Sequence, residues 1–211
     1  MGRDVRDRLR KLTIAPLGIA TLALLNERPM HPYEMFQTLL SRHEDRVVKV
    51  RPGSLYHTVA RLADDGLVRA AGTEREGNRP ERTTYEITAE GRDVLQEQLI
   101  DLLATPAEEY PVFPLALTEA HNVEPGLLAD LLRRRLLRLR GDLASYEAGL
   151  EAVTAKDLHE AYWLDLTYLR GLLAAEVDWL EGTIARLESG ELTWSVETQN
   201  PPNHETPKEL S

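Results

Sequence analysis

The 211-residue sequence contains no cysteine, which excludes disulfide bonds and thiolate metal sites. Its six histidines form no i, i+4 pair with a carboxylate in a metal-binding pattern, so we expect no metal and no other cofactor. A long apolar run is also missing. The longest, residues 14–25, is interrupted by Pro16, Gly18 and Thr21, so no membrane-spanning helix is expected.

A secretory leader and a strong positive charge are absent as well. Residues 1–11 carry two aspartates and no small-residue cleavage site follows them, so we expect a cytoplasmic protein. The net charge is −10, unevenly spread: residues 1–100 hold 16 Lys and Arg against 15 Asp and Glu, whereas residues 101–211 hold 9 against 20. Nucleic-acid binding by the first half would therefore need a local basic patch and a second subunit.

Residues 53–65 predict a short amphipathic helix. Pro52 suits its first turn and Gly66 the position just past its end. Leu55, Val59 and Leu62 recur at i, i+4 and i+7, which predicts one buried stripe. The polar residues beside this stripe are free to contact a DNA groove or phosphates, and they are Arg51, Ser54, Tyr56, His57, Thr58 and Arg61.

Two further helices are predicted before this one, the first within residues 12–26. The second begins near Pro32, with His31 at the N-cap, and we expect Tyr33, Phe36, Leu39 and Leu40 to form its buried side.

After the helix, residues 67–70 and 84–87 suit two short strands joined by a turn. The connecting loop carries Arg75 and Arg79, which we expect to contact phosphate or the minor groove, although nearby glutamates partly cancel their charge. Thr88 is placed to cap a further helix, whose packing depends on Val94, Leu95, Leu99, Leu102 and Leu103.

Three motifs in this order resemble the PadR-type transcriptional regulators, a family named for repressors that respond to phenolic acids. They are HPYE at 31–34, RPGSLYHTVARLADDGLV at 51–68 and TTYEITAEGRDVL at 83–95. The resemblance implies a mainly α fold with a small β wing, in which an N-terminal winged helix-turn-helix binds double-stranded DNA and C-terminal helices pair the subunits of a homodimer.

The second half predicts helices again after a proline-containing stretch at 105–125. We therefore expect a DNA-binding domain at 1–105, a helical dimerisation and effector domain at 106–192 and a disordered tail at 193–211. Apolar residues at heptad spacing in this half predict a helix interface. The residues predicted to form it are Leu136, Leu139, Leu143, Tyr146, Leu150, Leu169, Leu173 and Leu180, and Leu158, Leu172 and Trp179 broaden the apolar face.

Trp163 and Trp179 are candidates for binding a flat aromatic effector, as the resemblance suggests, although ordinary core or interface packing is the simpler explanation for either one of them. The arginine-rich run 133–140 flanks the leucine repeat, and we assign it no site.

These observations favour a ligand-responsive repressor that binds a pseudo-palindromic operator as a dimer. A dimeric adaptor or an activator of the same fold remains open. A hydrolase using Ser54 and His57 is disfavoured, because the sequence supplies no nucleophile elbow, oxyanion donor or well-placed orienting carboxylate.

Overall fold

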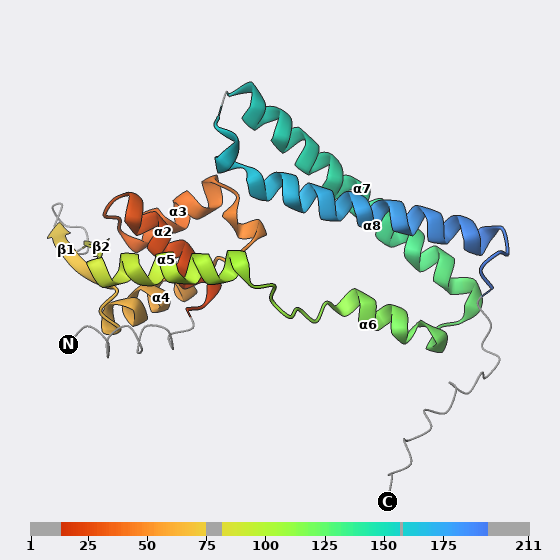
Figure 1. Cartoon of the computed structure of the whole chain (residues 1–211), viewed down its shortest axis with the longest axis horizontal. Coiled ribbons are helices and arrows are strands. Elements are labelled where there is room, and N and C mark those ends of the chain that lie inside the picture. Colours follow the sequence, from red (N-terminus) through yellow and green to blue (C-terminus); the bar gives the residue numbers. More distant parts are fainter. Residues whose placement is uncertain (1–13, 75–81, 157, 194–211) are drawn as a thin grey trace, which may run out of the picture. The chain divides into compact units, whose positions relative to one another are not determined.

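The computed structural model describes residues 14–74, 82–156 and 158–193. The chain divides into two compact units, Met1–Glu109 and Tyr110–Ser211, and both are mainly helical (Figure 1). In the first unit the elements are α2 (Pro16–Glu27), α3 (Pro32–Ser41), the 3-10 turn η1 (Glu44–Arg46), α4 (Pro52–Asp64), β1 (Val68–Glu74), β2 (Arg82–Ile87) and α5 (Ala89–Ala104). In the second they are α6 (Val112–Thr118), η2 (Ala120–Asn122), α7 (Pro125–Ala155), η3 (Glu160–Tyr162) and α8 (Leu164–Glu188).

The helix α4 forms as its sequence predicts. Pro52 occupies the first turn, and Leu55, Val59 and Leu62 are all buried. They join a core to which α2, α3, β1, β2 and α5 also contribute. The chain turns away at Gly66, whose φ of +75° lies in the left-handed region that favours glycine.

The predicted cap of α3 is also confirmed, but its predicted buried face is partly wrong. His31 Nδ1 accepts a hydrogen bond from the Tyr33 N–H at 3.1 Å. Tyr33 itself is 56% exposed, whereas Met35, which the prediction omitted, is fully buried. The buried residues of α3 are Pro32, Met35 and Leu39. Tyr33 follows Pro32 and therefore points about 100° away from it around the helix axis, off the buried side.

The two strands pair antiparallel, with Val68 opposite Ile87 and a bulge between Ala70 and Gly72. The backbone of Met30, between α2 and α3, exchanges two hydrogen bonds of 3.0 Å with Tyr85 on β2. This bridge ties the sheet to the helical core.

The helix α5 begins as predicted, because Thr88 Oγ1 accepts from the Gly91 N–H at 3.0 Å. Its packing differs from the prediction in the second half. Val94 and Leu95 are buried in the core, but three leucines expected to pack are exposed, because that core covers only the first half of α5. These exposed residues are Leu99, Leu102 and Leu103.

In the second unit α7 and α8 run antiparallel and pack along their lengths (Figure 1). The core between them is formed by Leu128, Leu132, Leu136, Val177, Leu180 and Ile184, and Phe113 and Leu117 of α6 pack against it. Salt bridges also join the two helices, and they pair Arg133 with Glu188, Arg135 with Glu176, Arg140 with Glu181 and Arg170 with Glu147. Three arginines of the run 133–140 are thus held by α8. No helix within the described ranges is both long and apolar enough to cross a membrane.

Candidate nucleic-acid interface

The helix α4 presents a polar face to solvent, opposite its buried stripe. Ser54, His57 and Arg61 are exposed there. Each lies about one turn from the next, at i, i+3 and i+7, so their side chains project from the same side of the helix. This spacing suits a helix that contacts successive bases along a groove.

Tyr56 lies at the border of this face, and a residue outside α4 orients it. Its ring meets the ring of His31 edge-on, with centroids 6.2 Å apart, and Tyr56 remains 47% exposed. His31 is itself held at the N-terminus of α3 through Tyr33. We predicted His31 only as a cap, and the contact with Tyr56 was missed because 25 residues separate the two in sequence.

Thr58 is less available than predicted. It is half-buried, and its hydroxyl donates a 2.8 Å hydrogen bond to the carbonyl oxygen of Ser54. A hydroxyl committed in this way keeps only its acceptor lone pairs for another molecule.

Positive charge is available at both ends of the polar face. Neither Arg51 nor Arg61 forms an ion pair with another described residue, and Arg51 lies at the N-cap of α4, where no side chain caps the helix. The first amides of α4 therefore point to solvent beside a guanidinium, an arrangement suited to phosphate. Other arginines of this unit are neutralised, in the pairs Arg28–Glu34, Arg42–Glu27 and Arg69–Glu86.

The arginines predicted at the tip of the wing, Arg75 and Arg79, lie outside the described residues. The structure describes the strands that lead to them, β1 and β2.

The comparison with protein families decides what this arrangement is. Residues 21–97, which span the core helices and the sheet, match the Transcriptional regulator PadR-like family. Residues 21–97 form a PadR-like domain. The chain is accordingly a DNA-binding transcriptional regulator and not an enzyme, and Ser54 and His57 belong to the winged helix of this domain rather than to a hydrolytic site.

Solved PadR structures share the fold over most of the chain. PadR of Bacillus subtilis in complex with operator DNA is 21% identical, with a TM-score of 0.70 over 82% of this chain and 99% of that one. The same protein in complex with p-coumaric acid is 19% identical, with a TM-score of 0.69 over 82% and 98%. A PadR-like regulator of Bacillus cereus is 17% identical, with a TM-score of 0.60 over 82% and 99%. The search of curated proteins finds no match.

In this PadR-like chain the predicted heptad residues of the second half face one another within a single molecule. Leu136 and Leu180 are buried in the α7–α8 core, and Leu139 and Leu143 pack against it. The other four residues of that prediction are half-buried, and they are Tyr146, Leu150, Leu169 and Leu173. The residues predicted to broaden this face, Leu158, Leu172 and Trp179, are instead exposed.

The two candidate effector residues are not brought together. Trp163 lies at the N-cap of α8, where its Nε1 donates to the carbonyl oxygen of Leu158 at 3.1 Å. Trp179 lies sixteen residues further along, about 24 Å away along the helix. A shallow groove of about 470 Å³ between α7 and α8 is lined by residues that include Leu137 and Arg140, and by neither tryptophan.

Proposed function

We propose that this regulator is a ligand-responsive repressor that binds a pseudo-palindromic operator as a homodimer in the cytoplasm. The exposed face of α4 is the observation that carries the proposal. It presents Ser54, His57 and Arg61 on one side of the helix. Arg61 and the N-cap residue Arg51 form no ion pair with other described residues.

In the proposed complex α4 enters the major groove. Ser54, His57 and Arg61 approach base edges, where an arginine pairs best with guanine O6 and N7. Arg51, Tyr56 and the N-terminal amides of α4 position the helix on phosphates. Further contacts to the DNA come from Thr58, which can accept a hydrogen bond, and from the wing residues Arg75 and Arg79.

A dimer places two α4 helices in successive major grooves, about 34 Å apart. The second subunit is needed because the first half of the chain is close to neutral, so one α4 helix offers few phosphate contacts.

The proposed effector is a small aromatic acid bound by the second unit. The basis is the likeness in fold to a PadR that has been crystallised with p-coumaric acid. All three tryptophans lie at 163, 179 and 194, so tryptophan fluorescence, excited selectively over tyrosine, reports on the second half of the chain alone. Titration with p-coumarate should quench or shift this fluorescence and weaken DNA binding in parallel. A response of neither signal to p-coumarate and related aromatic acids would remove the effector from the proposal.

The test of the central proposal is a mobility-shift or anisotropy titration with the DNA upstream of the protein's own gene, in a salt series. Counterion release predicts that log K falls linearly with log salt, with a slope of about −0.9 for each phosphate contacted. A competing random duplex of equal length measures specificity.

The near-neutral charge of the first half favours one alternative, a dimeric adaptor that does not bind DNA. Absence of binding at low salt would support it. Specific binding that raises transcription of the downstream gene would instead identify an activator.

A further inference from the structure

The ring of His31 joins two helices of the first unit that are far apart in sequence. Its Nδ1 accepts the hydrogen bond from the Tyr33 N–H that caps α3. The same ring meets the ring of Tyr56 on α4, with centroids 6.2 Å apart and ring planes at 75° to each other. Aromatic rings attract one another in this edge-on arrangement. The start of α3 is thereby in contact with the helix that carries the candidate DNA contacts.

The backbone around His31 fixes where its ring lies. Met30, the residue before it, is buried and exchanges two backbone hydrogen bonds of 3.0 Å with Tyr85 on β2. The carbonyl oxygen of His31 accepts from the Met35 N–H at 3.0 Å in the first turn of α3. Turning the ring over would break the Nδ1 hydrogen bond that caps α3. The position and the plane of the ring are thus determined by β2 and α3, independently of Tyr56.

The Tyr56 side chain is only partly held by its own unit. It is 47% exposed, and its hydroxyl forms no hydrogen bond with another described residue. An exposed side chain samples several rotamers, so binding a partner through it costs the entropy of fixing one of them. Contact with a ring that is already fixed reduces this cost, because it restricts the rotamers of Tyr56 before DNA binds.

Capping alone does not require a histidine at position 31. Serine, threonine, aspartate and asparagine are the residues preferred at the N-cap, since a short side chain with an oxygen acceptor satisfies one of the first amides of the helix. A histidine supplies an acceptor as well and adds a ring that reaches the next helix. Its use at the start of α3 therefore suits a residue that does more than cap.

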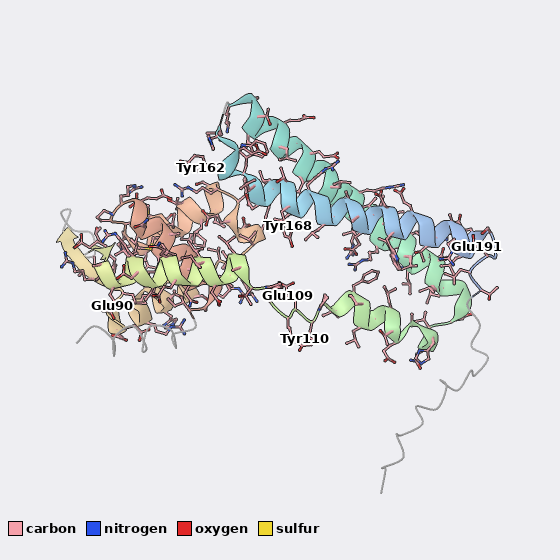
Figure 2. The ribbon with its side chains drawn as sticks, viewed as in Figure 1. Glu90, Glu109, Tyr110, Tyr162, Tyr168 and Glu191 are labelled. Atoms are coloured by element: carbon pink, nitrogen blue, oxygen red, sulfur yellow. The ribbon has the colours of Figure 1, made fainter. Side chains whose placement is uncertain are left out.

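A second histidine–tyrosine pair has the same chemistry in a different setting. His159 Nδ1 accepts from the Ala161 N–H at 3.2 Å, and the ring of His159 meets that of Tyr162 edge-on, with centroids 6.4 Å apart. Tyr162 lies at the turn between α7 and α8 (Figure 2). This pair is confined to one short turn of the second unit, so it offers a matched control for the pair that joins α3 and α4.

We propose that His31 is a positioning residue for DNA binding, which holds the Tyr56 ring in the orientation that brings its hydroxyl to a phosphate. The proposal rests on the proposed function, in which Tyr56 positions α4 on the DNA backbone. It adds a residue that acts through Tyr56 and does not itself contact DNA. Because a phosphate contact carries no sequence information, His31 contributes to affinity and not to the choice of operator.

His31→Asn separates the ring from the cap. Asparagine keeps an acceptor for the Tyr33 N–H, so the free energy of unfolding in urea should stay close to that of the wild type. The affinity should fall about two- to tenfold, both for the DNA upstream of the protein's own gene and for a random duplex of equal length. The slope of log K against log salt should not change, because no cationic contact with phosphate is lost. His159→Asn, the matched control, should change neither affinity nor slope.

A double-mutant cycle shows whether His31 acts through Tyr56. In a Tyr56→Phe background there is no hydroxyl to position, so His31→Asn should have no further effect on affinity. A role of His31 in the fold alone would instead lower the affinity by the same factor in both backgrounds.

NMR of the free protein supplies a readout that does not depend on DNA. The ring signals of Tyr56 are identified by their loss in Tyr56→Phe. In His31→Asn they should move toward the shifts of a freely rotating tyrosine, while the ring signals of Tyr162 stay in place.

The outcomes separate the role of His31 from the proposed function. Equal losses of affinity in the two backgrounds, or Tyr56 signals that His31→Asn leaves unchanged, would overturn the positioning role while DNA binding stands. A smaller salt slope in His31→Asn would show that His31 contacts phosphate itself, which also overturns it. Failure of the wild type to bind either duplex would overturn the proposed function, and the role of His31 with it.

Discussion

Gly91 lies directly against the carbonyl oxygen of Leu67. A Cβ atom at position 91 would be 2.1 Å from that oxygen and 2.8 Å from Cγ1 of Ile87. The same carbonyl accepts hydrogen bonds from Thr88, at 3.0 Å from the backbone N–H and at 3.1 Å from the hydroxyl. The turn that follows α4 and the start of α5 are thereby joined at one peptide group, which fixes how the core holds α4.

This contact predicts a loss of stability in Gly91→Ala. The methyl group has to displace backbone, and overpacking of this kind costs about 1 to 3 kcal/mol. Urea unfolding should show the lower free energy of unfolding. The matched control is Gly53→Ala in the first turn of α4, where an added Cβ meets nothing within 4 Å. That change should raise helix stability by about 0.5 to 1 kcal/mol. Equal effects of the two changes would contradict the close contact at Gly91.

Arg61→Ala tests the reading of base edges. Because Arg61 is exposed on the polar face of α4, we expect the variant to lose about 1 to 3 kcal/mol of discrimination between operator and random DNA. Anisotropy titrations on both duplexes measure this difference. If affinity falls equally for the two, Arg61 contacts only the DNA backbone.

Arg79→Ala tests the wing. A phosphate contact carries no sequence information, so the variant should bind operator and random DNA more weakly alike, and the slope of log K against log salt should become smaller by about one unit. An unchanged slope removes Arg79 from the phosphate contacts.

Leu139→Asp tests whether the heptad residues stabilise the fold of one chain. Leu139 packs against the core of the second unit, so the buried carboxylate should destabilise that unit by more than about 2 kcal/mol. Tryptophan fluorescence, which reports on this half, follows the unfolding. Leu137→Asp is the control, because Leu137 is 74% exposed and should change stability by less than about 0.5 kcal/mol. A folded, monomeric Leu139→Asp chain would show that this residue instead serves a subunit interface.

The Glu27–Arg42 pair predicts a pH dependence. Hydrogen bonds from Arg42, one of them 2.7 Å long, hold the pKa of Glu27 below its usual value. The stabilisation is therefore present above the unfolded value of about 4.3 and is lost as the pH falls through the lower folded pKa. Both side chains are nearly half exposed, so the pair contributes at most about 1 kcal/mol.

Glu27→Gln isolates this contribution. The variant should be less stable than the wild type at pH 7, and the two should converge in urea unfolding as the pH falls through the lowered pKa of Glu27. A difference that persists in acid would show that Glu27 stabilises the fold by packing and not by its charge.

Sequence alone predicted the elements whose formation depends on neighbours along the chain. The buried stripe of α4, the Thr88 cap of α5, the His31 cap of α3 and the glycine turn at Gly66 each depend on residues within a few positions. Helical spacing and the hydrogen-bonding capacity of a cap are local properties, so these predictions were confirmed. The PadR motifs between 31 and 95 were recognised for a similar reason, because they lie in order along the chain.

Only the tertiary structure decided which apolar residues are buried and by what. Tyr33 and Leu103 have the pattern of core residues, yet they are exposed because no described core element covers them. The heptad repeat of α7 is the same whether its partner is α8 of its own chain or a helix of another subunit, since the spacing specifies a face and not its occupant. The contacts of His31 with Tyr56 and of Gly91 with Leu67 join residues more than twenty positions apart, and no spacing rule reaches across that distance.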